Sequence, residues 1–360
     1  MKQEESVMKR PVDRRSFLKT GALAGGAAVG AGLLTSGKPA FAQNDEGRSE
    51  LTRGDVAILR FLAAAELIES DLWQQYAELG GITDGSQNPY QSALQVLDSD
   101  GSQYITSNTN DEISHATFLN AYLESKGAEP VNFDAFRNLK GSQATGAQDI
   151  GRLTNLMHLN VDTSWYIRYR STTNPDFGAT YPQAITINNR TTIPITDADF
   201  NNPNHIQVIA DSAAFHFGMI EQGGSSLYPS LGLKATSTEV LRIIFSIGGD
   251  EIAHFLEWVD FAGNAVSGPA VTDSGLTFPD FNTPPNPLLQ TNLIFPVSCE
   301  FIDPNLPKCS VIRPTLDQFA GAQATVAALT ASGLFMGQSK AFSNMLQQLA
   351  EEADRAQRRF

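Results

Sequence analysis

The sequence predicts an all-α protein built on a four-helix bundle. Two observations predict this class: four separate stretches repeat apolar residues at helical spacing, and a string of the form DEIxH occurs twice, at Asp111–His115 and at Asp250–His254. In each string the Glu and the His stand three residues apart, so both side chains leave the same face of a helix. Two such pairs on facing helices can supply ligands to one dinuclear metal site.

The N-terminal segment differs in composition from the rest of the chain. With 360 residues, of which 41% are hydrophobic, the chain can bury the core of one large or two ordinary domains. A basic stretch ending in Arg14-Arg15 precedes a Gly/Ala-rich apolar run over 21–34, which resembles a twin-arginine export signal. Ala40-Phe41-Ala42 has the pattern of a cleavage site. We therefore expect residues 1–42 to be a signal peptide, and the product to be periplasmic or extracellular.

The charge of the chain excludes some partners. The net charge is −14, and removal of the seven basic and three acidic residues in 1–42 would leave 18 basic against 36 acidic residues. Such a surface repels nucleic acid and anionic lipid and attracts cations. The apolar run over 21–34 is too short to span a bilayer comfortably. We expect no nucleic-acid partner and no stable membrane insertion.

The only two cysteines are Cys299 and Cys309, in a Pro-rich stretch. After export to an oxidising compartment they can close a short disulfide loop. A metal site built on the two thiolates is disfavoured because no histidine lies within about forty residues of either.

The first two helices of the bundle follow a polar linker over 43–52. One is predicted over 55–79, where it stops at Gly80-Gly81. The next is predicted from about Asp111 to Gly127, with the polar residues Ser107-Asn108-Thr109-Asn110 as its N-terminal cap. An insertion over 128–204 then carries a helix over about 147–170 and a β-hairpin around Asn188-Asn189. The rest is predicted as a helix over 205–227, a helix over 238–262 capped by Ser237, a loop region over 264–313 and a C-terminal helix over 314–360.

Two of these helices carry a carboxylate on an apolar stripe. Burying an unpaired carboxylate costs several kcal/mol, so Glu66 and Glu221 require a compensating partner. Each is followed seven residues later by an aromatic residue, Trp73 and Tyr228 respectively, which makes the four helices two similar halves. Glu69 lies on the same stripe as Glu66 and stays an alternative to it.

Four carboxylates and two imidazoles complete the predicted ligand set. The ligands are Glu66, Glu112, His115, Glu221, Glu251 and His254. Their four negative charges balance two divalent cations, and carboxylate with imidazole suits iron or manganese. The predicted cofactor is therefore two Fe or two Mn ions.

Over residues 53–263 these motifs resemble the ferritin-like superfamily, and the two DExxH strings are similar to those of bacterioferritin. The resemblance implies that Glu66 and Glu221 are terminal ligands, that Glu112 and Glu251 bridge the metals, and that each histidine ligates one metal. It also implies that aspartates orient the histidines across the site, Asp111 with His254 and Asp250 with His115. Trp73 and Tyr228 are expected beside the ligands.

The chain departs from the storage ferritins that it resembles. Gly223-Gly224 and Gly248-Gly249 interrupt two ligand helices, where each glycine costs about 1 kcal/mol relative to Ala. They either permit close helix contact or mark kinks. The insertion, the export signal and the C-terminal extension make a hollow storage shell unexpected, and a smaller homo-oligomer stays open. The organisation is more similar to exported ferritin-like proteins grouped with desiccation-related proteins.

Three functions fit the sequence. The first is a di-iron or di-manganese oxidoreductase that acts on dioxygen or peroxide, with ferroxidase, oxidase and catalase-like activities all open. The second is a non-catalytic stress- or desiccation-related envelope protein with a structural or vestigial metal site. The third is a metal-free bundle whose buried carboxylates are protonated and hydrogen-bonded.

Overall fold

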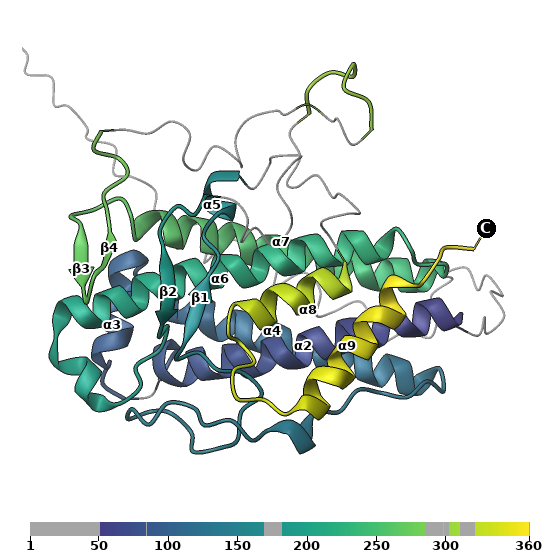
Figure 1. The fold of residues 1–360 in the computed structure, drawn as a ribbon, viewed down its shortest axis with the longest axis horizontal. Coiled ribbons are helices and arrows are strands. Elements are labelled where there is room, and N and C mark those ends of the chain that lie inside the picture. Colours follow the sequence, from purple (N-terminus) through teal and green to yellow (C-terminus); the bar gives the residue numbers. More distant parts are fainter. Residues whose placement is uncertain are drawn as a thin grey trace, which may run out of the picture. The chain divides into compact units, whose positions relative to one another are not determined.

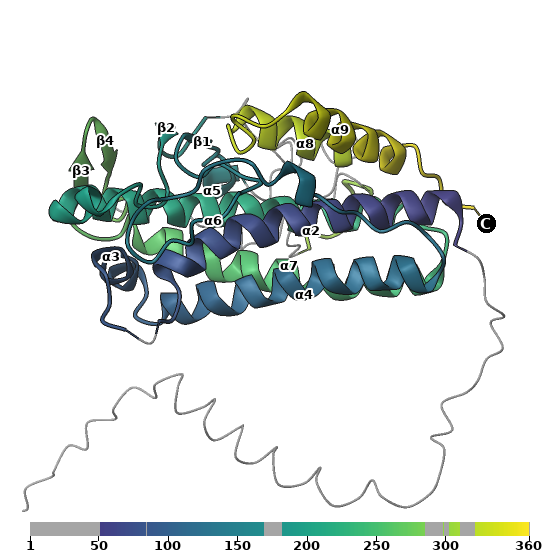
Figure 2. The same ribbon diagram turned by 90° about the horizontal axis from the view of Figure 1, so that it is seen from below.

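Four long helices lie along one another in the computed structural model (Figure 1, Figure 2). The structure describes residues 51–83, 85–168, 182–284, 298, 302–309 and 321–359. The long helices are α2 (Arg53–Gly80), α4 (Gly101–Ser125), α6 (Pro203–Gly232) and α7 (Thr238–Asn264). The mainly helical class is thus confirmed. No helix in the described ranges combines the length and the apolar character needed to cross a membrane.

The ends of α2 and α7 are set by local sequence. The Thr52 side chain accepts a hydrogen bond from the backbone N–H of Asp55 at the start of α2, and the Ser237 side chain does the same for Val240 at the start of α7. Helix α2 ends at Gly80, where the next residue becomes extended. These bounds, and those of α6, match the predicted helices within a few residues.

Helix α4 begins ten residues before the predicted start near Asp111. The polar residues interpreted as a cap lie inside the helix, where Asn108 and Thr109 are buried. The Thr109 hydroxyl is 2.7 Å from the carbonyl oxygen of Ile105 and 3.1 Å from that of Trp73. Their polar groups therefore find partners within the helical interior, which sequence pattern alone does not reveal. A short helix that was not predicted, α3 (Pro89–Leu97), precedes α4.

The long helices pack as two antiparallel pairs. In the first pair, a Cβ on Gly80 of α2 would lie 3.4 Å from Ile105 of α4, while Trp73 contacts Thr109 further along. Residue numbers fall along one helix as they rise along the other, so the two run in opposite directions. Helices α6 and α7 form the second pair. The two pairs contact each other through side chains of α2 on α6 and of α4 on α7, described below.

The insertion between the pairs is largely irregular. It holds η1 (Asp134–Phe136), β1 (Leu159–Val161), α5 (Trp165–Arg168), β2 (Ile187–Arg190) and η2 (Asp197–Asn201). The helix predicted over 147–170 was wrong except for the single turn of α5. Buried Asp71 of α2 accepts hydrogen bonds from the backbone N–H groups of Leu153 and Thr154, and this holds the segment against α2 in a non-helical conformation. The predicted hairpin was also wrong, because β2 pairs antiparallel with β1.

The C-terminal region contains more structure than predicted. Strands β3 (Val271–Asp273) and β4 (Leu276–Phe278) form a hairpin inside the predicted loop region. The predicted C-terminal helix is two helices, α8 (Ala322–Ala331) and α9 (Lys340–Asp354), separated by a turn in which Gly333 has a φ of 88°. Figure 2 shows both beside α2 and α6. Residues 1–42 and Cys299 lie outside the described residues, so the signal peptide and the Cys299–Cys309 disulfide stay predictions.

Candidate metal centre

The structure brings the six predicted ligands together, one or two from each long helix. Among the described residues, three groups have donor atoms that all lie within 4.8 Å of one another; one of them is Asp111, Asp250 and His254, and the other two contain the six predicted ligands. Of these two, the first, here called the four-residue group, is Glu66, Glu112, His115 and Glu251; the second, here called the three-residue group, is Glu112, Glu221 and His254. Glu112 belongs to both. The four glutamates are at most 1% exposed, so the cluster is a buried concentration of carboxylates.

His115 faces the four-residue group with one ring nitrogen. Its Nδ1 is 3.3 Å from Glu112 Oε2 and 3.4 Å from Glu66 Oε2. Glu251 Oε1 lies 3.9 Å from the same nitrogen. Carboxylates from α2, α4 and α7 therefore converge on a single imidazole nitrogen, which is an arrangement suited to a cation.

His254 has the corresponding position in the three-residue group. Its Nδ1 is 3.0 Å from Glu112 Oε1 and 3.4 Å from Glu221 Oε2. The two oxygens of Glu112 thus face different histidines, because Oε2 faces His115. A carboxylate placed in this way can bridge two metal ions.

Each aspartate of the DEIxH strings contacts the histidine of the other string. Nε2 of His115 is 3.2 Å from Asp250 Oδ2, and Nε2 of His254 is 3.4 Å from Asp111 Oδ2. The aspartate side chains are 44% and 45% exposed, so they form the solvent-facing side of the cluster. A carboxylate on Nε2–H leaves the Nδ1 lone pair directed at the glutamates, as metal-ligating histidines require.

Several buried carboxylate oxygens lack a hydrogen-bond partner within the described part of the chain. They are Glu66 Oε2, Glu221 Oε2 and both oxygens of Glu251. Buried polar atoms in proteins almost always have partners, and an unpaired carboxylate is among the costliest groups to bury. Burial raises the pKa of Glu251 well above its usual range, and the charge of Glu112 raises it further. The chemistry of these residues therefore fits a site that could hold a cation.

Glycines of α6 and α7 make room for this cluster. A Cβ at Gly224 would lie 2.0 Å from Glu251 Oε2, and one at Gly248 would lie 2.7 Å from Cβ of Tyr228. Both helices continue through their glycines. Of the two roles expected for the glycines, close contact is the one observed at these positions.

Tyr228 and Trp73 have different roles despite their matching positions in sequence. The Tyr228 hydroxyl donates a hydrogen bond to Glu66 Oε1, so this residue lies beside the ligands. The indole N–H of Trp73 has no hydrogen-bond partner among the described residues, and its ring stacks on Trp258 with ring centroids 5.2 Å apart. Trp73 therefore packs through its ring, and its predicted place next to a ligand stays a prediction.

Asn108 is the site residue that the sequence did not reveal. Its Nδ2 is 2.7 Å from Glu112 Oε1 and 3.2 Å from Glu221 Oε1. The residue stands one helical turn before Glu112, and that spacing on a ligand-bearing helix is the signal that could have identified it. Its polar type instead suggested a helix cap.

The electrostatics of the cluster favour bound protons or cations. Burial raises the pKa of Glu112 to about 8, with further contributions from the charges of Glu221 and Glu66. Burial lowers the pKa of His115, but the contacts of its ring with the negative carboxylates of Glu112 and Glu66 outweigh burial and raise the pKa to about 10. The pKa of His254 is also raised, because the charge of Glu221 and the neighbouring hydrogen bonds outweigh burial. Among these residues alone, protons supply the compensating charge.

Glu69 lies beside the cluster without joining either group. It is partly buried, and burial raises its pKa well above the usual range, followed by the charges of Glu112, Glu66 and Glu221. Its oxygens are in neither set of donor atoms, whereas those of Glu66 are. The geometry therefore favours Glu66 over Glu69 as the α2 ligand.

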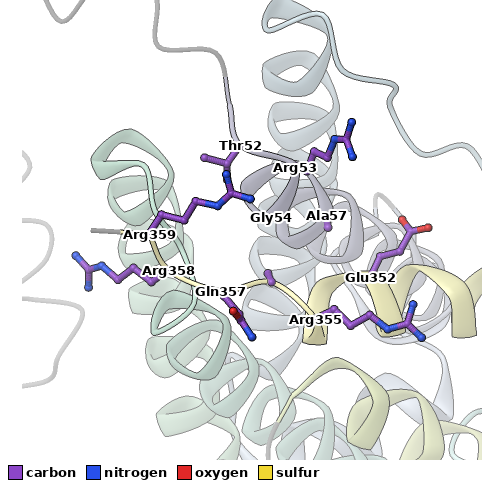
Figure 3. Close-up of a pocket in the computed structure, with 10 residues that line it drawn as sticks. Thr52, Arg53, Gly54, Ala57, Glu352, Arg355, Gln357, Arg358 and Arg359 are labelled. Carbon is purple, nitrogen blue, oxygen red and sulfur yellow. The ribbon is translucent and has the colours of Figure 1, made fainter.

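The other three histidines lie elsewhere. His158 contacts Asn189, His205 lies between Asp199 and Asp273, and buried His216 contacts the hydroxyl of Tyr76. A pocket of about 490 Å³ lies where the start of α2 meets the C-terminal segment, and four arginines line it together with Glu352. Figure 3 shows that the arginine side chains point apart from one another, so they do not converge on one ligand.

No family model, no curated protein and no solved structure matches the chain. The chemistry of the cluster rests on its own residues, a buried set of carboxylates and imidazoles that could hold metal.

Proposed function

We propose that the chain is an exported ferritin-like protein with a dinuclear iron or manganese centre that carries out redox chemistry on dioxygen or peroxide. The observation that carries this proposal is the set of buried glutamate oxygens without hydrogen-bond partners in the described part of the chain. They face two imidazole nitrogens in two overlapping groups of donor atoms. Two divalent cations would neutralise the four carboxylates, which otherwise repel one another.

The ligand roles follow from the two groups. Glu66, His115 and Glu251 would hold one metal and Glu221 and His254 the other, with Glu112 shared between them. The sequence resemblance makes Glu251 a second bridging ligand. A bound pair of this kind supplies electron transfer to dioxygen or peroxide and Lewis acidity.

The protein's own contribution is to orient ligands and restrict access. Asp250 and Asp111 hold the Nε2 proton of the opposite histidine, so that Nδ1 is presented to the cluster. The carboxylates are buried and the histidines are at most 9% exposed. Such a closed site favours a substrate as small as dioxygen or peroxide over a larger organic molecule.

The same closure supports a second candidate, a non-catalytic envelope protein in which the metals are structural. A metal bound only to the folded state stabilises that state according to its affinity. This candidate predicts a large rise in melting temperature on metal binding and no turnover of peroxide or dioxygen.

Elemental analysis of protein purified from its native host tests the proposed centre. We expect about two Fe or Mn per chain, and a chain purified without metal that also fails to take up Fe(II) or Mn(II) would refute the centre. Anaerobic loading with Fe(II), followed by exposure to oxygen or peroxide, then separates the two candidates. Repeated turnover supports the enzyme, whereas stable binding without turnover supports the structural role.

Two glutamate variants identify the α2 ligand in the same experiment. Glu66→Ala should lower the metal content, while Glu69→Ala should retain about two metals per chain, because only Glu66 belongs to a donor group. The opposite result would move the ligand to Glu69 without removing the proposed centre.

A further inference from the structure

The orientation of the Asn108 amide is fixed by the fold. Its Oδ1 lies 2.7 Å from the indole nitrogen of Trp258, and its Nδ2 faces Glu112 and Glu221. An indole N–H can only donate, so the amide oxygen must face Trp258 and the amide NH₂ must face the carboxylates. Asn108 and Trp258 are both nearly fully buried. The amide therefore donates to one carboxylate oxygen from α4 and one from α6.

The other half of the repeat has no such amide. One turn before Glu251 the chain has Ile247, a buried aliphatic residue that cannot donate a hydrogen bond. Both oxygens of Glu251 lack a partner in the described ranges, while Glu66 receives its hydrogen bond from Tyr228. The two halves therefore differ in how their carboxylates are held.

The amide donates on the His254 side of the cluster. Glu112 Oε1, which accepts its hydrogen bond, is 3.0 Å from His254 Nδ1, and Glu221 Oε2 is 3.4 Å from the same nitrogen. Nδ2 itself is 3.3 Å from His254 Nδ1. Asn108 thus touches all three residues of the three-residue group, and none of Glu66, His115 or Glu251.

We propose that Asn108 is a positioning residue that holds Glu112 and Glu221 in place around His254, so that the two metal positions have unequal affinities and fill in order. This inference rests on the dinuclear centre proposed above. The four-residue group fills first, because it offers more ligands and its Glu251 oxygens have no other partner among the described residues. The three-residue group fills second, and its affinity depends on the amide.

Titration of the metal-free chain with Co²⁺, followed by calorimetry and by visible absorption, tests this inference. The native chain should bind two Co²⁺ in two distinguishable steps. Asn108→Leu, similar in size but unable to donate, should weaken the second step by about 10- to 100-fold and leave the first nearly unchanged. Trp258→Phe, which keeps a buried ring but removes the indole N–H, should weaken the same step less.

The two variants should also be non-additive, because Trp258 acts through Asn108. Asn120→Leu is the matched control: Asn120 lies on the same helix and, within the described ranges, its hydrogen bonds are to the backbone of Val131, away from the cluster. It should change neither step. If Asn108→Leu does not fold, Trp258→Phe alone tests the inference: the ratio of the first Co²⁺ affinity to the second should then be larger than in the native chain.

The outcomes separate this inference from the proposed function. Two equal steps in the native chain, or equal losses in both steps on Asn108→Leu, would overturn the role of Asn108 and leave the dinuclear centre intact. Failure of the native chain to bind any Co²⁺, Fe(II) or Mn(II) would overturn both.

Discussion

Nε2 of His115 lies 3.2 Å from Oδ2 of Asp250, although the two residues belong to different copies of the DEIxH string. The reverse contact joins His254 to Asp111 at 3.4 Å. Helices α4 and α7 are therefore connected twice at the site, and each copy supplies the group that orients the other copy's histidine. A substitution of the aspartate in one copy should therefore alter metal binding at the histidine of the other copy.

Asp250→Asn should weaken metal binding at the position that contains His115 by about 10- to 100-fold. An uncharged amide accepts the Nε2 proton more weakly than the carboxylate and can instead present its NH₂ to the ring, so the tautomer with its proton on Nε2 is less favoured and Nδ1 becomes a poorer ligand. Titration with Mn²⁺ or Co²⁺ measures the effect. Asp260→Asn, an exposed change on the same helix, is the control. An unchanged titration for Asp250→Asn would show that this contact does not orient the ligand.

Gly224→Ala should destabilise the protein by about 1–3 kcal/mol and lower its metal content, because the new Cβ would lie 2.0 Å from Glu251 Oε2. Urea unfolding and metal analysis measure both effects. Gly249→Ala is the control, since a Cβ there meets nothing within 4 Å on an exposed helix position. That variant should be more stable by up to about 1 kcal/mol. Equal effects of the two changes would contradict a special role for Gly224.

The bundle helices with local signals could be predicted from sequence. Caps such as Thr52 and Ser237, with regular apolar spacing after them, determine where α2 and α7 begin. The start of α4 could not be predicted from sequence. Asn108 and Thr109 resemble cap residues, and their hydrogen-bond partners Trp258 and Trp73 are distant in sequence. Hydrogen bonding to distant groups, rather than local helix propensity, determines the conformation of such segments.

The ligand types could be predicted for a similar reason. Glu and His in repeated ExxH strings show their chemistry by type and spacing. The segment around Leu153 could not be predicted, because its conformation depends on buried Asp71 of α2, far away in the chain. The difference between Tyr228 and Trp73 likewise depends on which side chain faces each aromatic residue, and the sequence pattern makes them appear equivalent.

Tyr228→Phe should destabilise the metal-free protein by about 1–3 kcal/mol, because it removes the hydrogen bond to a buried oxygen of Glu66. The loss should be smaller with metal bound, since a cation then compensates the same carboxylate. Thermal unfolding with and without Mn²⁺ measures both values. Tyr122→Phe removes an exposed hydrogen bond to Glu239 and should change stability by less than about 0.5 kcal/mol. A loss for Tyr228→Phe that metal does not reduce would count against Glu66 as a ligand.

Metal binding should release protons and strengthen as pH rises from 7 to 9. The pKa of Glu112 is raised to about 8 and that of His115 to about 10, so these two neighbouring groups together hold protons in the metal-free fold at neutral pH. A cation must displace those protons from its ligands. Calorimetric titrations with Mn²⁺ at one pH, in buffers with different ionisation enthalpies, count the protons released. Binding without proton release would mean that the ligands are already deprotonated.

The same pKa values determine how the stability of the metal-free protein changes with pH. Both are raised above their unfolded values, so each group stabilises the fold below its unfolded pKa and loses that contribution as pH rises through the folded value. Between pH 7 and 9 the folded chain binds more protons than the unfolded chain, and the free energy of unfolding should fall. Burial lowers the pKa of His216 to about 3, so His216 changes the free energy of unfolding only below its unfolded pKa near 6.5. It therefore has no effect between pH 7 and 9. The rise in melting temperature caused by Mn²⁺ should therefore be larger at pH 9 than at pH 7, and a smaller rise would contradict protons and metal competing for the cluster.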